Sequence, residues 1–128
     1  MFINIVIKMN ETENKVLNCA FKVFLLYGYH ATTLQQIAKE ARVNQATIHY
    51  YFRTKENLYS FVIEYLINLV ISNDVDNIEN IGKGKIVWFL NTEQYNNKIL
   101  FEKNMEKLFQ SKSEDIIGKI QNFIYCND

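Results

Sequence analysis

The sequence contains no proline and only four glycines in 128 residues. Proline breaks helices and glycine weakens them, so their scarcity favours helix along the whole chain. The two cysteines, Cys19 and Cys126, are too few for a disulfide framework or a zinc site. They are typical of a reduced, cytoplasmic setting. The chain also lacks the run of about 18 apolar residues that a membrane-spanning helix needs.

Residues that carry catalytic chemistry are equally scarce. His30 and His49 have no cysteines or paired carboxylates at metal-ligand spacing. The sequence shows no nucleophile–base pair and no glycine-rich phosphate loop. These absences predict a protein that is not an enzyme and that holds no metal or cofactor. Residues 1–8 lack a basic start and a cleavage site, so they do not resemble a secretion signal, and Met9 is a second possible start.

The composition is that of a globular protein, with 48% hydrophobic and 22% charged residues. The net charge is zero, but its distribution is uneven. Residues 1–60 hold seven Lys and Arg against four Asp and Glu, and residues 61–128 hold seven against ten. A locally basic first half on a neutral chain suits a small anionic partner surface, although chance also produces such a difference.

Helical periodicity and capping residues predict three helices in the first half of the chain. The first runs from Glu11 to Tyr27, is capped by Asn10 or Thr12, and ends at a left-handed Gly28.

The next two helices are short. Thr33 and Gln36 form a capping box for the second helix, whose buried stripe ends at Ala41. Asn44 caps the third helix, which runs from Gln45 to about Phe52. Two short helices joined by so few residues predict a helix-turn-helix.

The second half is predicted to be helical as well. Its expected parts are a long helix from Lys55 to Ser72 capped by Thr54, a linker over residues 73–84, a helix over Ile86–Leu90, a helix from Thr92 to Gln110, and a last helix from Ser113 to Tyr125. The expected domains are an N-terminal extension (1–10), the helix-turn-helix domain (11–54), and a connecting helix with a shortened helical region (55–128).

The outward face of the third helix is the most informative feature. Gln45, Thr47, His49 and Tyr50 are expected to point outward, which a merely hydrated surface does not require. In a DNA major groove, glutamine pairs with adenine and a small side chain such as Ala46 meets a thymine methyl group.

Polar side chains nearby suit the DNA backbone. Thr, Tyr and His bind phosphate oxygens, and Thr33 and Lys55 stand at helix starts that favour phosphate. The alternative is a helical protein whose third helix packs on a protein partner through its aromatic residues.

Two segments, AFKVFLLYGYHATTLQQIAKEARV and NQATIHYYFRTKENL, carry a family resemblance. The stretch from about Lys15 to Phe61 resembles the N-terminal DNA-binding domain of TetR-type transcriptional regulators. Matching features include the Gly28-Tyr29 pair, Ile37-Ala38, and the Tyr-Phe close of the third helix. The resemblance implies an all-α fold with a three-helix DNA-binding head, homodimers on palindromic operators in double-stranded DNA, and repression relieved by a small-molecule effector.

The resemblance also implies roles for single residues. Base contacts fall on Gln45, Ala46 and Tyr50. Phosphate contacts fall on Thr33, Gln35, Thr47, His49, Tyr51 and Lys55. Two positions depart from the family pattern: Arg42 stands where glycine is common, and His49 stands where tyrosine is usual.

The region after the head is shorter than the resemblance implies. The aromatic residues there are expected to form core rather than a ligand pocket; they are Trp88, Phe89, Tyr95, Phe101 and Phe109. A weak homodimer is predicted through the last helix and its apolar neighbours, which are Phe101, Met105, Phe109, Ile117, Ile120 and Ile124. The alternative is a truncated remnant, or a partner-binding protein without DNA-binding activity of its own.

Overall fold

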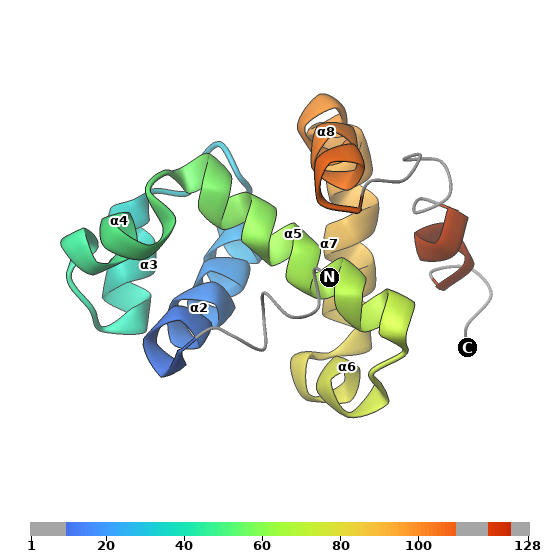
Figure 1. The fold of residues 1–128 in the computed structure, drawn as a ribbon, viewed down its shortest axis with the longest axis horizontal. Helices are drawn as coiled ribbons and strands as arrows, with labels where there is room; N and C mark the ends of the chain where they lie inside the picture. The colour runs from blue at the N-terminus through green and yellow to red at the C-terminus, as the bar shows by residue number, and fades with distance from the viewer. Residues whose placement is uncertain (1–9, 110–117, 124–128) are drawn as a thin grey trace. The chain divides into compact units, whose positions relative to one another are not determined.

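The computed structural model describes residues 10–109 and 118–123, and within that part every regular element is a helix. Figure 1 labels the helices used below. They are α2 (Glu11–Tyr27), α3 (Leu34–Ala41), α4 (Gln45–Phe52), α5 (Lys55–Ser72), α6 (Val75–Ile81), α7 (Lys83–Asn96) and α8 (Lys98–Phe109). The chain divides into two compact units within α5, the first ending at Val62 and the second beginning at Ile63. We call the first unit the head.

The helices of the head begin where the capping residues predict. Asn10 caps α2, because its side-chain oxygen accepts the Glu13 N–H at 2.8 Å. Thr33 and Gln36 form the predicted capping box of α3. For the first helix, two caps were expected, Asn10 or Thr12, and the hydrogen bond to Glu13 shows that the cap is Asn10. Gly28 ends α2 with a φ of 82° and a ψ of 164°, so it has positive φ but not the left-handed helical conformation that was expected.

Apolar side chains hold the head together. α3 packs on α2, and α4 packs on α3. The side chains between them are buried, as the periodicity predicts. This core includes Val16, Leu17, Ala20, Phe21, Phe24, Ile37, Ala38, Ala41, Ile48, Phe52, Leu58 and Tyr59. The rings of Phe24, Tyr29 and Tyr59 add edge and stacking contacts between the end of α2 and α5.

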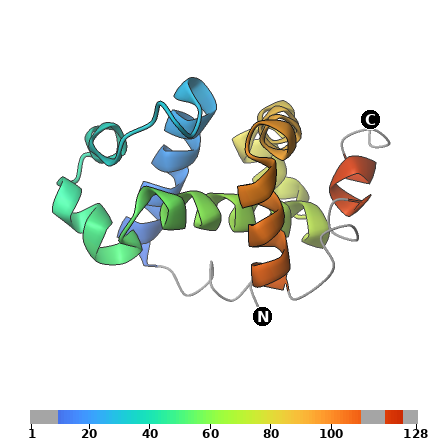
Figure 2. The same ribbon diagram turned by 90° about the horizontal axis from the view of Figure 1, so that it is seen from above.

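The second unit departs from the sequence prediction at two places. The predicted linker over residues 73–84 is wrong, because it contains α6, which Asp74 caps and whose Ile78 is buried. The predicted helix start at Thr92 is also wrong. Thr92 lies inside α7, where its hydroxyl donates to the Trp88 carbonyl oxygen at 2.6 Å. α7 ends at Asn96 with Asn97 as its C-cap, and α8 begins at Lys98 in a different direction (Figure 2).

Of the five aromatic residues expected in the core of the second unit, the structure describes the side chains of three, and two of these are buried. Phe89 and Phe101 lie in its core, as expected, whereas Trp88 is 56% exposed. Residues 118–123 are helical, and Ile120 and Phe123 on this segment are buried. The side chains of Tyr95, Met105 and Phe109, and residues Ser113, Ile117 and Ile124, lie outside what the structure describes. In the described ranges, no helix has the length and apolar character that a bilayer span requires.

Two buried polar groups of α5 lie in the second unit without hydrogen-bond partners among the described residues. They are Oε1 of Glu64 and Nδ2 of Asn68. The Glu64 side chain is nearly inaccessible to solvent, and this burial raises its pKa to about 7. A buried carboxylate that lacks partners destabilises the fold when it is charged.

Stability should therefore depend on pH. Because the folded-state pKa of Glu64 is raised, the folded chain holds a proton that the unfolded chain releases between about pH 4.5 and about pH 7. Stability falls as pH rises through this window. We expect Glu64→Gln to stabilise the protein by about 1–2 kcal/mol at about pH 8, and by little at about pH 5, in urea unfolding. The exposed Glu79→Gln variant is the control. An equal gain at both pH values would contradict the prediction.

Candidate nucleic-acid interface

The outer face of α4 is exposed as the sequence predicts. Ile48 and Phe52 turn inward and are buried. Gln45, Ala46, His49 and Tyr50 are exposed, and Tyr50 is 74% exposed. A large aromatic side chain with this much accessible surface at the end of a short helix is suited to contact a partner molecule.

Thr47 and Tyr51 lie at the edge of this face and are half-buried. The Thr47 hydroxyl donates to the side-chain oxygen of Asn44 at 2.9 Å, so a phosphate contact through that proton requires this bond to be given up. The Tyr51 hydroxyl accepts from the Asn10 amide at 3.3 Å and keeps its own proton for another acceptor. The Tyr51 ring packs edge-on against Tyr50.

The start of α3 offers further donors. The Thr33 hydroxyl oxygen accepts the Gln36 N–H at 3.1 Å, which leaves the hydroxyl proton available. Gln35 in the first turn is exposed. A helix N-terminus favours an anion, because its backbone N–H groups lack helical partners and its dipole is positive there.

Lys55 is more tightly held than the sequence indicates. Its ammonium donates to the carbonyl oxygens of Tyr29 at 2.9 Å and Thr32 at 3.0 Å. It also lies 4.5 Å from the centre of the Tyr29 ring. Two of its three N–H groups are therefore used within the head, and one remains for an external anion.

Lys55 binds the loop between α2 and α3, and two residues of this loop have structural roles that the sequence analysis missed. Thr32 is buried, and its hydroxyl lies 2.6 Å from the Gly28 carbonyl oxygen and 3.3 Å from that of Val23. Tyr29 packs against the buried Tyr59. The Lys55 and Tyr59 contacts of this loop join residues 23 to 30 positions apart, so no local pattern could have indicated them.

Arg42 occupies the turn between α3 and α4 in the left-handed conformation, with φ 58° and ψ 42°. Glycine would be more stable there by about 1 kcal/mol, because its lack of Cβ removes the steric cost. Arg53, after α4, also has positive φ, at 74°. Both side chains are exposed.

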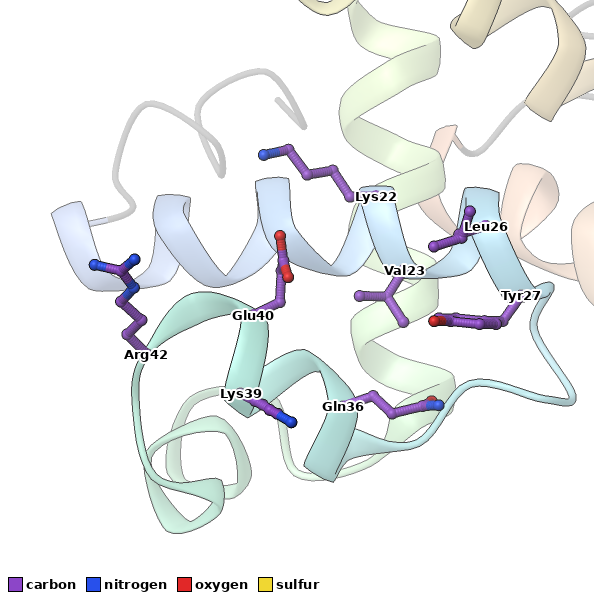
Figure 3. A pocket seen from close by; sticks show the side chains of 8 residues that line it. All are labelled: Lys22, Val23, Leu26, Tyr27, Gln36, Lys39, Glu40 and Arg42. Carbon is purple, nitrogen blue, oxygen red and sulfur yellow. The ribbon is translucent and has the colours of Figure 1, made fainter.

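An open groove runs between α2 and α3 of the head (Figure 3). Lys22, Lys39 and Arg42 line it with one carboxylate, Glu40. Arg42 lies at the end of this groove away from Tyr27 (Figure 3). In the described part of the chain, no group of His, Cys, Asp and Glu side chains is arranged to hold a metal ion.

The contacts of Lys55 lead to a stability prediction. Lys55→Ala removes two charge-assisted hydrogen bonds and should destabilise the protein by about 1–2 kcal/mol in urea or thermal unfolding. Lys39→Ala, which removes an exposed lysine of the same head, should change stability by less than about 0.5 kcal/mol. Equal unfolding midpoints for the two variants would show that the Lys55 contacts do not stabilise the head.

The sequence of the head is similar to those of known transcriptional regulators. Residues 16–60 match the model of the family described as bacterial regulatory proteins, tetR family. YerO, an uncharacterized HTH-type transcriptional regulator of Bacillus subtilis, is 32% identical over 77 residues. RutR, an HTH-type transcriptional regulator of Escherichia coli, is 37% identical over 61 residues. IcaR of Staphylococcus epidermidis, the negative transcriptional regulator of the biofilm operon icaADBC, is 30% identical over 69 residues.

These matches cover 60%, 48% and 51% of this chain but only 26%, 29% and 37% of the three relatives. The chain thus matches between 26% and 37% of the length of these relatives. Among solved structures, a mutant form of HlyIIR has a TM-score of 0.59 at 26% identity, covering 88% of this chain and 70% of that one. HlyIIR itself, a hemolysin II transcriptional regulator, has a TM-score of 0.52 at 24% identity, with 88% and 74% covered, and supports the fold.

Proposed function

We propose that this chain, whose residues 16–60 match the model of the tetR family, is a sequence-specific DNA-binding transcriptional regulator and acts as a repressor. The observation that carries the proposal is the outer face of α4, where Gln45, Ala46, His49 and Tyr50 are exposed together on a helix whose other side is buried. In this proposal, residues 11–54 are the DNA-binding domain and residues 55–128 are the connecting helix and the effector and dimerisation region.

Base reading is assigned to three residues of α4, which enters the major groove. The Gln45 amide pairs with N6 and N7 of an adenine, and the Ala46 methyl group meets a thymine methyl group. Tyr50 supplies an exposed ring and hydroxyl for a third base contact. A repressor acts by occupying its operator, so these contacts select the site and need no further chemistry.

Backbone contacts are assigned to residues that surround α4. Thr33 and Gln35 at the start of α3 bind one phosphate group with the help of the helix N-terminus. Thr47, His49, Tyr51 and Lys55 bind phosphate oxygens beside α4, and Lys55 uses its remaining N–H group. Such contacts fix the orientation of the head but do not distinguish sequences.

A pair of matched glutamine variants tests the two kinds of contact. Gln45→Ala should weaken binding to the preferred site by about 1–3 kcal/mol and change binding to random duplex little. Gln35→Ala should weaken both by the same factor, because a phosphate contact is independent of sequence. The DNA upstream of the protein's own gene is the first site to test by gel shift. Equal losses for Gln45→Ala on both DNAs would assign Gln45 to the backbone, and no shift with any duplex would contradict the proposed function.

A homodimer is part of the proposal, because one head neutralises too few phosphates for tight binding. Two heads on a palindrome stand about 34 Å apart, one helical turn of DNA. The expected interface needs one change: Phe101 and Ile120 are buried within the second unit and are not available to a partner. Among the side chains of this unit that the structure describes, the large apolar ones that are exposed are Val75, Trp88 and Ile99, and Ile99 is 85% exposed.

Self-association should therefore depend on those exposed residues. At tens of micromolar, sedimentation should detect a dimer, and Ile99→Glu or Trp88→Glu should shift it toward monomer. Lys119→Glu changes an exposed residue of the last described helical segment and serves as the matched control. A larger effect of Lys119→Glu would place the interface on the 118–123 segment. A strict monomer that fails to bind operator DNA would favour the truncated remnant.

A further inference from the structure

An arginine with positive φ lies near each end of α4: Arg42 precedes the helix and Arg53 follows it. Arg42, two residues before the helix cap Asn44, has φ 58° and ψ 42°. Arg53, the C-cap, has φ 74° and ψ −60°. The Thr54 N–H donates to the Phe52 carbonyl oxygen at 2.8 Å, which closes a γ-turn centred on Arg53. This γ-turn is rare and strained for residues other than glycine.

The arginine side chains do not explain this strain by stabilising the head. Both are exposed, and neither forms an ion pair or a side-chain hydrogen bond with the residues that the structure describes. Glu40 lines the same groove as Arg42 without an ion pair between them in that part of the chain. The backbone N–H of Arg53 donates to the His49 carbonyl oxygen, a bond that glycine would also form. Strained residues that give nothing to the fold are candidates for a role in binding.

The positions of the two residues indicate what they bind. α4 has eight residues, so it is about 12 Å long, close to the width of the DNA major groove of about 12 Å. When such a helix lies across the groove, a cation at each of its ends comes within reach of the phosphate rows that border the groove. Guanidinium groups bind phosphate oxygens with two parallel hydrogen bonds. We propose that Arg42 and Arg53 are DNA-backbone contacts and that their charge is the reason for arginine at these strained positions. This inference rests on the proposed function.

Glycine variants separate charge from strain. Arg42→Gly and Arg53→Gly, each in the full chain, relieve the backbone and remove the cation. With a random-sequence duplex of about 30 base pairs, followed by fluorescence anisotropy, each variant should bind about eightfold more weakly per head at about 0.1 M salt. The slope of log K against log salt should become less steep by about 0.9 per head. The melting temperature should stay unchanged or rise by about 2–4 °C.

Two further variants serve as controls. Asn73→Gly changes the third residue outside glycine with positive φ among those described, φ 54°, which lies in the second unit. It relieves the same kind of strain without removing charge, so DNA binding should stay at the level of the unchanged chain. Arg53→Lys keeps the cation and should keep the salt slope, with part of the affinity lost because lysine binds phosphate through a single point charge.

Three outcomes would overturn the inference. If both glycine variants bind with the affinity and salt slope of the unchanged chain, the arginines do not contact DNA, and the proposed function stands. If the glycine variants melt several degrees lower, the side chains stabilise the head, and the strain has a structural reason. If the unchanged chain binds no duplex at all, the proposed function fails and this inference fails with it.

Discussion

The ammonium group of Lys55 lies between the carbonyl oxygens of Tyr29 and Thr32, and the geometry of the head depends on this contact. The loop after α2 decides where α3 begins, and α3 in turn supports α4. By binding two carbonyls of that loop, the first residue of α5 joins the connecting helix to the start of the helix-turn-helix. The buried Thr32 hydroxyl and the Tyr29–Tyr59 ring pair hold the same loop from its other side. Hydrogen bonds thus connect the start of α5 to the loop that precedes α3.

The two units treat their polar groups differently. In the head, Asn10, Thr33, Asn44 and Thr54 each accept a backbone N–H at a helix start. Satisfied caps define where each helix begins, and they leave hydroxyl and amide groups on the surface for a partner. In the second unit, Glu64 and Asn68 are buried with polar atoms that lack partners among the described residues. Burial raises the pKa of Glu64, which predicts a pH dependence of stability that originates outside the proposed DNA-binding surface.

The apolar residues of the second unit serve two purposes in the proposed function, the core of the unit and a surface for self-association. A unit built from the end of α5 and the helices after it must bury its own core before it can bind a second copy. Phe89, Phe101, Ile120 and Phe123 are used for that core. Trp88 and Ile99 remain exposed, which is why the proposed dimer interface is assigned to them rather than to the buried Phe101 and Ile120.

Local patterns in the sequence determined the head: the helix ranges Glu11–Tyr27 and Gln45–Phe52, the caps Asn44 and Thr54, and the inward Ile48 and Phe52 were predicted as observed. Caps and helical periodicity act over three or four residues, so the sequence displays them directly. The assigned base and phosphate contacts stay predictions, since they depend on DNA. The helix over residues 75–81 and the end of α7 were missed although both have local contacts, the Asp74 cap and the Asn97–Glu93 hydrogen bonds. Tertiary structure alone decided the Lys55 contacts and the burial of Glu64, because they depend on residues brought together from distant parts of the chain.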